Sequence, residues 1–206
     1  MKKLLAGHHA FRREYVQASS VFLRTLASVD QNPDALFIGC SDSRVIPELL
    51  TNSTPGQLFV VRNIANLVPP SQHPHSSVGA AIEYAVVALG VENIIVCGHT
   101  RCGGVRAMLD GVDAEQMPSL AKWIRDAAKM NLSAQNHSLP HDIRWHHAIE
   151  ENVLDQIDHL LTYPAVAKKL HEGRLHLHGW VYDLLGGLTV YDPELDRFVE
   201  PSLNTL

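Results

Sequence analysis

Short apolar runs bounded by turn-forming residues predict buried β-strands in this chain. The first run spans residues 35–40, follows Asn-Pro-Asp at 32–34 and is too brief for a helix. Similar runs cover residues 58–62, 93–97 and 174–182. Each of the four segments is therefore a candidate strand.

A helical pattern separates the second and third of these strands. The segment that begins at Val78 has Ser77 as a candidate N-cap and Gly90 as its C-terminal stop. Its apolar residues recur with the i, i+3, i+4, i+7 spacing of one helix face, at Val78, Ala81, Ile82, Ala85, Val86 and Leu89. Similar recurrence predicts further helices over residues 11–27, 119–130 and 145–161.

Strands that alternate with helices predict an α/β fold. We expect a central, mainly parallel β-sheet flanked by helices, with an N-terminal helical arm over about residues 1–30. The chain has 206 residues, of which 46% are hydrophobic, enough for one substantial core but not for two. The prediction is a single domain over residues 1–206.

Composition excludes several classes of partner. The chain carries 17 Lys and Arg against 22 Asp and Glu, a net charge of −5, so nothing indicates binding to nucleic acid or to an anionic membrane. No segment is long and apolar enough to span a bilayer, and the N-terminal apolar stretch is too short for a signal peptide. Three cysteines do not make a disulfide framework, so we expect a cytoplasmic protein whose cysteines bind metal or take part in catalysis.

The residues that carry chemistry follow two of the predicted strands. Cys40 ends the first strand, and His99 and Cys102 follow the strand at 93–97. In parallel sheets, functional groups collect beyond the carboxyl ends of the strands. Two thiolates and one imidazole suit zinc and leave its fourth position open, as in catalytic sites. The alternative is that the cysteines are small core residues and the histidine is satisfied by hydrogen bonds.

Asp42 and Arg44 lie directly beyond Cys40. A carboxylate there is a fourth metal ligand, an acceptor for a metal-bound water, or an ion-paired bystander. A bidentate pair with Arg44 would keep Asp42 ionised and away from the metal. The alternative for this short polar run is a helix cap with a surface ion pair.

These motifs resemble those of the β-class carbonic anhydrases. The resemblance rests on Cys-Ser-Asp-Ser-Arg at 40–44 and His-Thr-Arg-Cys-Gly-Gly at 99–104, and it continues through residues 59–70, 79–85 and 178–183. It implies one zinc ion per subunit, held by Cys40, His99 and Cys102, with Asp42 and Arg44 as the catalytic dyad. It also implies the reversible hydration of carbon dioxide to bicarbonate and a proton, by attack of zinc-bound hydroxide.

The resemblance also implies a substrate pocket and an oligomer. In the plant-type subgroup, which this chain resembles more closely, the pocket positions correspond to Gln31, Phe59 and Tyr84, with the amide of Gly103 as a further substrate contact. Part of the pocket comes from a neighbouring subunit in this family, so we expect a homodimer or a larger even homo-oligomer.

A second subgroup of the family is inhibited by bicarbonate bound at a Trp, Arg and Tyr triplet. Arg62 and Tyr182 match two of these positions, but Phe37 stands at the Trp position and lacks the indole donor. The resemblance therefore argues for the open, plant-type site and against the regulatory site.

Two other functions remain open from the sequence. The same zinc hydroxide could hydrolyse carbon disulfide or carbonyl sulfide. Alternatively, the zinc could stabilise a non-catalytic interaction protein in which Asp42 closes the coordination sphere, although Arg44 argues against this.

The remaining cysteine and histidines are interpreted as structural. Cys97 could rival the metal ligands, but we expect it to be a core residue of its strand. His176 and His178 alternate along a strand without an evident third ligand. Four histidines in helical segments are expected at the surface: His146, His147, His159 and His171.

Overall fold

The computed structural model describes residues 1–72, 76–127 and 138–202. The chain divides into two compact units, Met1–Asn32 and Pro33–Leu206. The boundary lies close to the end of the arm expected over about residues 1–30. The end predicted for one helix, at Met130, lies outside the described residues.

The first unit is helical throughout most of its length. It contains α1 (Lys2–Phe11), a π-helical segment η1 (Arg12–Val16) and α2 (Ser20–Ser28). The helix predicted over residues 11–27 is therefore longer than expected and is interrupted between η1 and α2. None of the three helical segments contains a buried residue. Exposed apolar side chains are Leu4, Leu5, Phe11, Tyr15, Val21 and Phe22.

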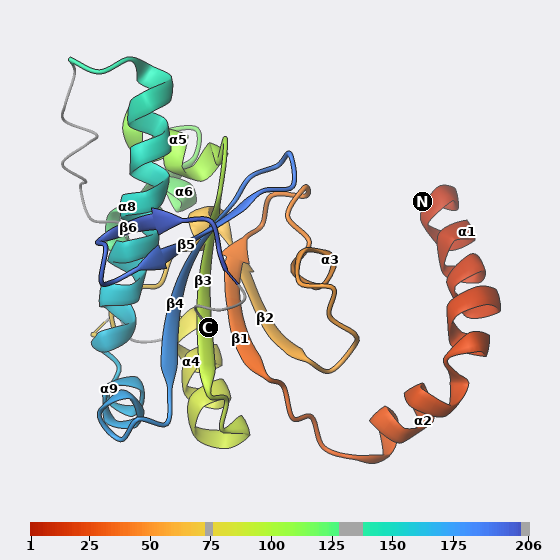
Figure 1. The fold of residues 1–206 in the computed structure, drawn as a ribbon. Coiled ribbons are helices and arrows are strands. Elements are labelled where there is room, and N and C mark those ends of the chain that lie inside the picture. The colour runs from red at the N-terminus through yellow and green to blue at the C-terminus, as the bar shows by residue number, and fades with distance from the viewer. Residues whose placement is uncertain (73–75, 128–137, 203–206) are drawn as a thin grey trace. The chain divides into compact units, whose positions relative to one another are not determined.

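A six-stranded sheet forms the centre of the second unit, in the order β2-β1-β3-β4-β5-β6 (Figure 1). The first four strands are parallel, and the last two pair antiparallel. The bounds are β1 (Ala35–Cys40), β2 (Leu58–Asn63), β3 (Asn93–His99), β4 (His176–Tyr182), β5 (Leu188–Asp192) and β6 (Arg197–Val199). The predicted mainly parallel α/β fold is confirmed. The sequence reasoning found the four parallel strands but missed β5 and β6.

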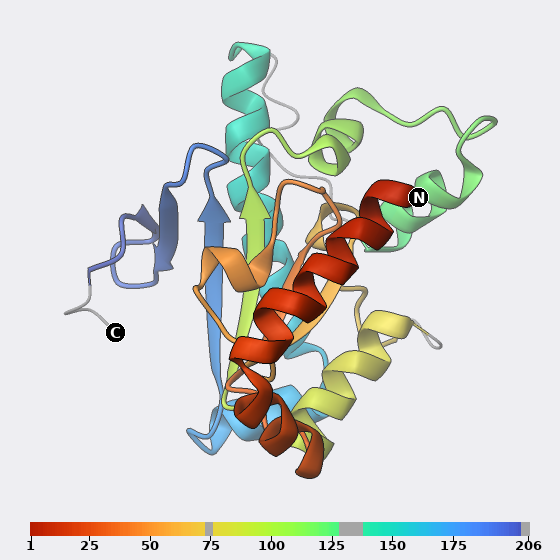
Figure 2. The same ribbon diagram turned by 90° about the vertical axis from the view of Figure 1, so that its right-hand side faces the viewer.

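Helices pack on both faces of the sheet, but more of them pack on one face than on the other (Figure 2). The larger core cluster joins strand residues to α4, α5, α8 and α9, whereas the smaller cluster on the other face is joined by Leu50 of α3. The helical elements are α3 (Pro47–Leu50), η2 (Ile64–Asn66), α4 (Ser77–Glu83), η3 (Tyr84–Leu89), α5 (Gly103–Asp110), α6 (Pro118–Ala127), α8 (His141–Leu161) and α9 (Pro164–His171). None of these described helices combines the length and hydropathy needed to cross a bilayer.

The alternating directions of successive strand side chains create the two core clusters. Leu36, Ile38, Ile94 and Val96 belong to the larger cluster, and Phe37 belongs to the smaller one. Successive side chains of a strand point to opposite faces, so a run that is apolar throughout fits a strand buried on both sides. The unbroken burial of β1 has this cause.

Close packing of α8 on the sheet requires glycine in β3. A Cβ atom added at Gly98 would lie 2.8 Å from Cγ2 of Val153 and 3.2 Å from Cγ2 of Ile149. Any larger residue would therefore push α8 away from the strand that ends at His99.

The predicted N-cap of α4 is wrong by one residue. Ser76, rather than Ser77, is the N-cap, and its hydroxyl accepts a hydrogen bond from the amide of Gly79 at 3.4 Å. Gly90 ends the helical segment as predicted, with a left-handed φ of 73°. The last part of this segment, η3, is π-helical.

His159 is not at the surface, contrary to prediction. It is buried on α8, and its Nδ1 lies 2.7 Å from the carbonyl oxygen of Val68. Two other polar residues of α8 are also buried: Asn152 donates to Ala65 O at 3.0 Å, and Gln156 accepts from the Val68 amide at 2.8 Å. Buried backbone groups need partners, and α8 supplies them to the loop after β2.

We expect His178 to make unfolding stability depend on pH. Burial, and secondarily the charge of His176, lowers the pKa of His178 in the folded protein, and its Nε2 lies 2.9 Å from Oδ1 of Asn93. The unfolded imidazole titrates near 6.5, so the unfolded state binds the proton more readily. The free energy of unfolding should therefore fall as pH drops from about 7 to about 5.

Urea unfolding at three pH values tests this expectation. His178→Gln should show a smaller loss of stability on acidification than the unsubstituted protein. His8→Gln, at an exposed position of α1, is the control. Equal pH slopes in the unsubstituted protein and His178→Gln would contradict the prediction.

Candidate metal centre

Three buried donors meet at the carboxyl ends of β1 and β3. Cys40 is the last residue of β1, His99 is the last residue of β3, and Cys102 is the N-cap of α5. Because β1 and β3 are adjacent parallel strands, their carboxyl ends lie at the same edge of the sheet. One donor atom from each residue lies within 4.8 Å of the other two, and the two sulfur atoms are 3.8 Å apart. The structure thus brings together the three ligands that the sequence predicted.

The orientation of His99 suits a metal ligand. Its Nδ1 lies 3.0 Å from the carbonyl oxygen of Thr100, which fixes Nδ1 as the protonated nitrogen and leaves a lone pair on Nε2. Nε2 is buried and has no hydrogen-bond partner among the described residues. A buried acceptor without a partner is costly, and a metal ion between Nε2 and the two thiolates would satisfy it.

The two buried sulfur atoms lie within hydrogen-bonding distance of each other. The hydrogen bond from the Cys102 side chain lowers the pKa of Cys40 to about 4, and the amides of Asp42 and Ala65 act in the same direction. The same hydrogen bond and burial raise the pKa of Cys102 far above its ordinary range. Amides of Gly104 and Val105 partly oppose that effect. A cation bound between them would hold both sulfurs as thiolates.

Asp42 is held by Arg44 at the rim of this group. Nε and Nη2 of Arg44 donate to the two carboxylate oxygens at 2.9 and 2.7 Å, and the Arg44 amide adds a hydrogen bond of 3.0 Å. The Arg44 hydrogen bonds hold the pKa of Asp42 well below its usual range. Oδ2 of Asp42 lies 4.0 Å from Nε2 of His99. The carboxylate is therefore ionised beside the donor group, with both oxygens bound by Arg44.

Arg62 fixes the backbone of the segment that contains Asp42. Its Nε donates to the carbonyl oxygen of Cys40 at 2.9 Å, and its Nη2 donates to that of Asp42 at 2.6 Å. One guanidinium thus ties the end of β1 to β2. This role was not anticipated from the sequence, where Arg62 was considered only for the regulatory site.

A left-handed turn after β2 lies against the start of α5. Ala65 and Asn66 have φ values of 65° and 49°, and the Ala65 amide hydrogen-bonds to Cys40. A Cβ atom at Gly104 would lie 2.8 Å from the Cβ of Ala65 and 2.8 Å from Cγ2 of Ile64. Glycine is required there for the turn to reach the thiolate. No sequence signal indicated the Ala65 turn.

The predicted pocket residues are placed only in part. The rings of Phe59 and Tyr84 lie 5.9 Å apart, and Tyr84 remains 48% exposed. Gly103 is the first residue of α5. Gln31 belongs to the first unit, so its relation to the site stays a prediction.

The remaining predicted residues lie on neighbouring strands. Tyr182 pairs with His99 across β4 and β3, and Phe37 is buried in edge-to-face contact with Trp180 at 6.3 Å. Cys97 is buried with Phe37 in the smaller core cluster. Burial raises the pKa of Cys97 to about 12, which suits a neutral thiol in the core.

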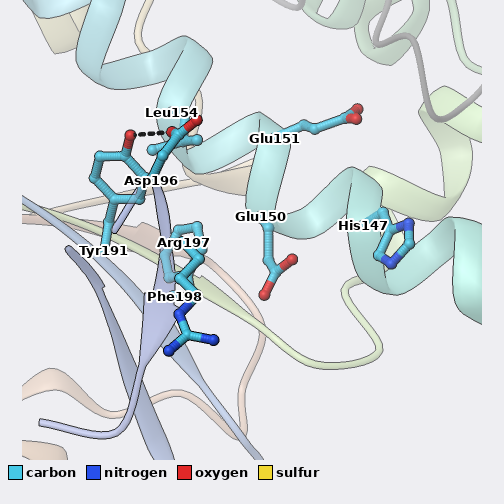
Figure 3. Close-up of a pocket in the computed structure, with 8 residues that line it drawn as sticks. All are labelled: His147, Glu150, Glu151, Leu154, Tyr191, Asp196, Arg197 and Phe198. Carbon is cyan, nitrogen blue, oxygen red and sulfur yellow. Dashed lines mark hydrogen bonds between the residues drawn. The ribbon is translucent and has the colours of Figure 1, made fainter. Parts of the chain in front are cut away.

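A separate surface pocket of about 330 Å³ lies between α8 and the last two strands (Figure 3). It is lined by His147, Glu150, Glu151, Leu154, Tyr191, Asp196, Arg197 and Phe198. The Tyr191 hydroxyl donates to Asp196 at 2.6 Å, which raises the pKa of the tyrosine. None of the predicted site residues lines this pocket, so the candidate site is the Cys-His-Cys group.

Known proteins resemble the whole chain. A family model described as carbonic anhydrase matches residues 35–189. A carbonic anhydrase of Pseudomonas aeruginosa is 43% identical over 202 residues, which cover 97% of this chain and 91% of the relative. Carbonic anhydrase 1 of Escherichia coli O157:H7 is 40% identical over 208 residues, covering 99% and 94%.

Solved structures show the same similarity. The β-carbonic anhydrase CcaA matches with a TM-score of 0.93 at 40% identity, over 98% of this chain and 92% of that chain. One of two tetrameric β-carbonic anhydrases of Sordaria macrospora matches with a TM-score of 0.78 at 29% identity, over 92% and 95%.

Substitution of single cysteines should separate the ligands from the core. Cys102→Ser should lose stoichiometric zinc, because a serine hydroxyl does not replace a thiolate ligand. Cys97→Ser should keep one zinc per subunit, because Cys97 lies in the other core cluster. Metal content of the purified variants by mass spectrometry measures both. Zinc loss in Cys97→Ser with retention in Cys102→Ser would reverse the assignment.

Proposed function

The chain belongs to the β-class carbonic anhydrases and is a zinc enzyme that hydrates carbon dioxide reversibly; we propose that Asp42 and Arg44 are its catalytic pair. Cys40, His99 and Cys102 would hold the ion. The proposal rests on the bidentate hydrogen bonds from Arg44 to Asp42 beside these donors.

The zinc ion supplies Lewis acidity. When bound, it would lower the pKa of a water molecule to about 7 and so make a nucleophile available at neutral pH. The two thiolates and the unpartnered Nε2 of His99 fit this ion. The buried donors and their amide partners keep the ligand set rigid.

Asp42 would orient the attacking water. An ionised carboxylate accepts hydrogen bonds at both oxygens and donates none, and Arg44 keeps Asp42 ionised. Both carboxylate oxygens are bound by Arg44, which also disfavours Asp42 as a fourth ligand. This contact supports the catalytic function over that of a non-catalytic zinc-stabilised protein.

Carbon dioxide would bind in an apolar pocket beside this pair. We assign Gln31, Phe59 and Tyr84 to its walls and the Gly103 amide to a substrate oxygen. The contact between the Phe59 and Tyr84 rings supports a shared wall. This arrangement is that of the plant-type subgroup.

A second copy of the chain would complete the pocket. Tyr84 is 48% exposed, and the helices of the first unit bury none of their residues. Such apolar surfaces are typical of protein interfaces. We therefore propose a homodimer or a larger even homo-oligomer, in the cytoplasm, where the three free cysteines stay reduced.

The active site would lack a bicarbonate switch. The Arg62 guanidinium already donates to the carbonyl oxygens of Cys40 and Asp42, and Phe37 offers no donor at the third position. Tyr182 alone does not make an anion site.

Asp42→Asn should keep zinc but lose most hydration activity. The amide cannot act as an ionised acceptor, and loss of a positioned acid or base typically lowers rates by about 10² to 10⁴. Stopped-flow hydration of carbon dioxide, together with zinc content, measures the effect. Asp196→Asn, in the separate pocket, is the control and should keep full activity. Full activity in Asp42→Asn would rule out the proposed pair.

Inhibition by bicarbonate should be hyperbolic. If no second bicarbonate site regulates the enzyme, the hydration rate will fall as for simple product inhibition, without a threshold. Initial rates at a series of bicarbonate concentrations and at two pH values test this. A sigmoidal dependence would show that Arg62 and Tyr182 do form a regulatory site.

A further inference from the structure

Trp145 of α8 contacts the ligand loop directly. Its Nε1 donates a hydrogen bond of 3.0 Å to the carbonyl oxygen of Cys102, and its side chain is buried, with 8% exposed. The same carbonyl accepts the Arg106 amide at 3.0 Å, the first hydrogen bond of α5. Both lone pairs of this oxygen are therefore used, and the peptide between Cys102 and Gly103 is fixed in direction.

Charged groups hold the indole of Trp145 in place. The guanidinium carbons of Arg101 and Arg106 lie 5.6 and 5.5 Å from its ring centre. Asp110 accepts from Arg106 at 3.0 Å and lies 2.8 Å from His141, whose ring stands edge-on to Trp145. The indole is thus oriented by a network of its own.

The loop that Trp145 contacts is strained. Arg101, between two of the proposed zinc ligands, has a left-handed φ of 58°. This conformation is disfavoured for a residue with a Cβ atom. On the other side, Thr100 is tied to β4 by its amide, which donates to Tyr182 O at 2.9 Å. Contacts on both sides keep the strained loop in one conformation.

Trp123 makes an equivalent contact with the second loop. Its Nε1 donates to the carbonyl oxygen of Ile64 at 3.0 Å. The amide of that same peptide belongs to Ala65, which hydrogen-bonds to Cys40. Because a peptide group is planar, a donor on its oxygen constrains the direction of its N–H and also polarises it.

We propose that Trp123 and Trp145 are positioning residues for the zinc centre, each holding one ligand-bearing or ligand-contacting loop by its backbone carbonyl. The inference rests on the proposed zinc site. Trp145 fixes the peptide that follows Cys102, and Trp123 fixes the peptide whose amide meets Cys40. Neither side chain touches the metal or the substrate.

Replacement of each tryptophan by phenylalanine tests this role. Trp123→Phe and Trp145→Phe keep an aromatic ring but remove the N–H donor. Trp180→Phe is the matched control. Trp180 is the third tryptophan of the chain, lies in β4 and packs against Phe37. Zinc loss to excess chelator is timed in each folded holoenzyme, and cobalt-substituted protein reports the thiolate-to-metal charge-transfer band.

Both loop variants should release zinc about 10-fold faster or more, the usual effect of losing a partner of a ligand. The cobalt band should shift in Trp123→Phe, where the Cys40 amide donor is disturbed. Trp180→Phe should change neither. Release within twofold of the unsubstituted protein in both loop variants, or equal acceleration in Trp180→Phe, would overturn the proposal.

If a phenylalanine variant fails to fold, an isosteric analogue of tryptophan can be used in its place. Benzothienylalanine at position 123 or 145 keeps the bicyclic ring and replaces only the N–H. We expect it to release zinc as fast as the corresponding phenylalanine variant. Absence of zinc or of a thiolate band in the unsubstituted protein would refute the zinc site itself. A normal unsubstituted protein with unchanged variants would refute only the positioning role.

Discussion

The fold is organised around the buried sulfur pair of Cys40 and Cys102, where any negative charge must be compensated. Their sulfurs lie 3.8 Å apart, and both residues are buried. A thiolate at this depth is unstable unless donors or a cation compensate for it. The protein supplies amide donors from the Ala65 turn and from the start of α5. These donors would remain when zinc binds, so the folded chain is prepared for the ion beforehand.

The Ala65 turn links this charge to the core of the protein. The turn supplies an amide to Cys40, yet its own carbonyls are inside the molecule and need partners. Asn152 of α8 donates to the Ala65 carbonyl. From the same helix, His159 lies against the carbonyl of Val68, which follows the turn, and Gln156 accepts from the Val68 amide. The polar stripe on the buried face of α8 therefore supports the candidate metal site, although it contributes no ligand. Glycine at 98 and 104 allows the close approaches that this arrangement needs.

Local patterns predicted the parts of the structure that depend on neighbouring residues. The bounds of β1 were correct, because a short run apolar throughout suits no other element, and the three ligands followed from their places at strand ends. Partners distant in sequence decided what was missed. His159 resembles a surface helical residue until Val68 is placed beside it. The antiparallel strands β5 and β6 lacked strong apolar runs, and the indole contacts join residues 43 or 59 positions apart.

The solvent exposure of the side chains increases from His99 through Asp42 to Arg44, and this order suits the chemistry of the site. The side chain of His99 is fully buried, that of Asp42 is 17% exposed and that of Arg44 is 53% exposed. Ligands that solvent cannot reach would retain the ion, whereas the proposed pair of Asp42 and Arg44 at the rim would exchange protons with water. Arg62 makes this arrangement rigid, because it ties the backbone of Cys40 and of Asp42 to the same guanidinium. The proposed proton acceptor, Asp42, is therefore fixed in relation to Cys40, and a proton would leave without the metal being exposed.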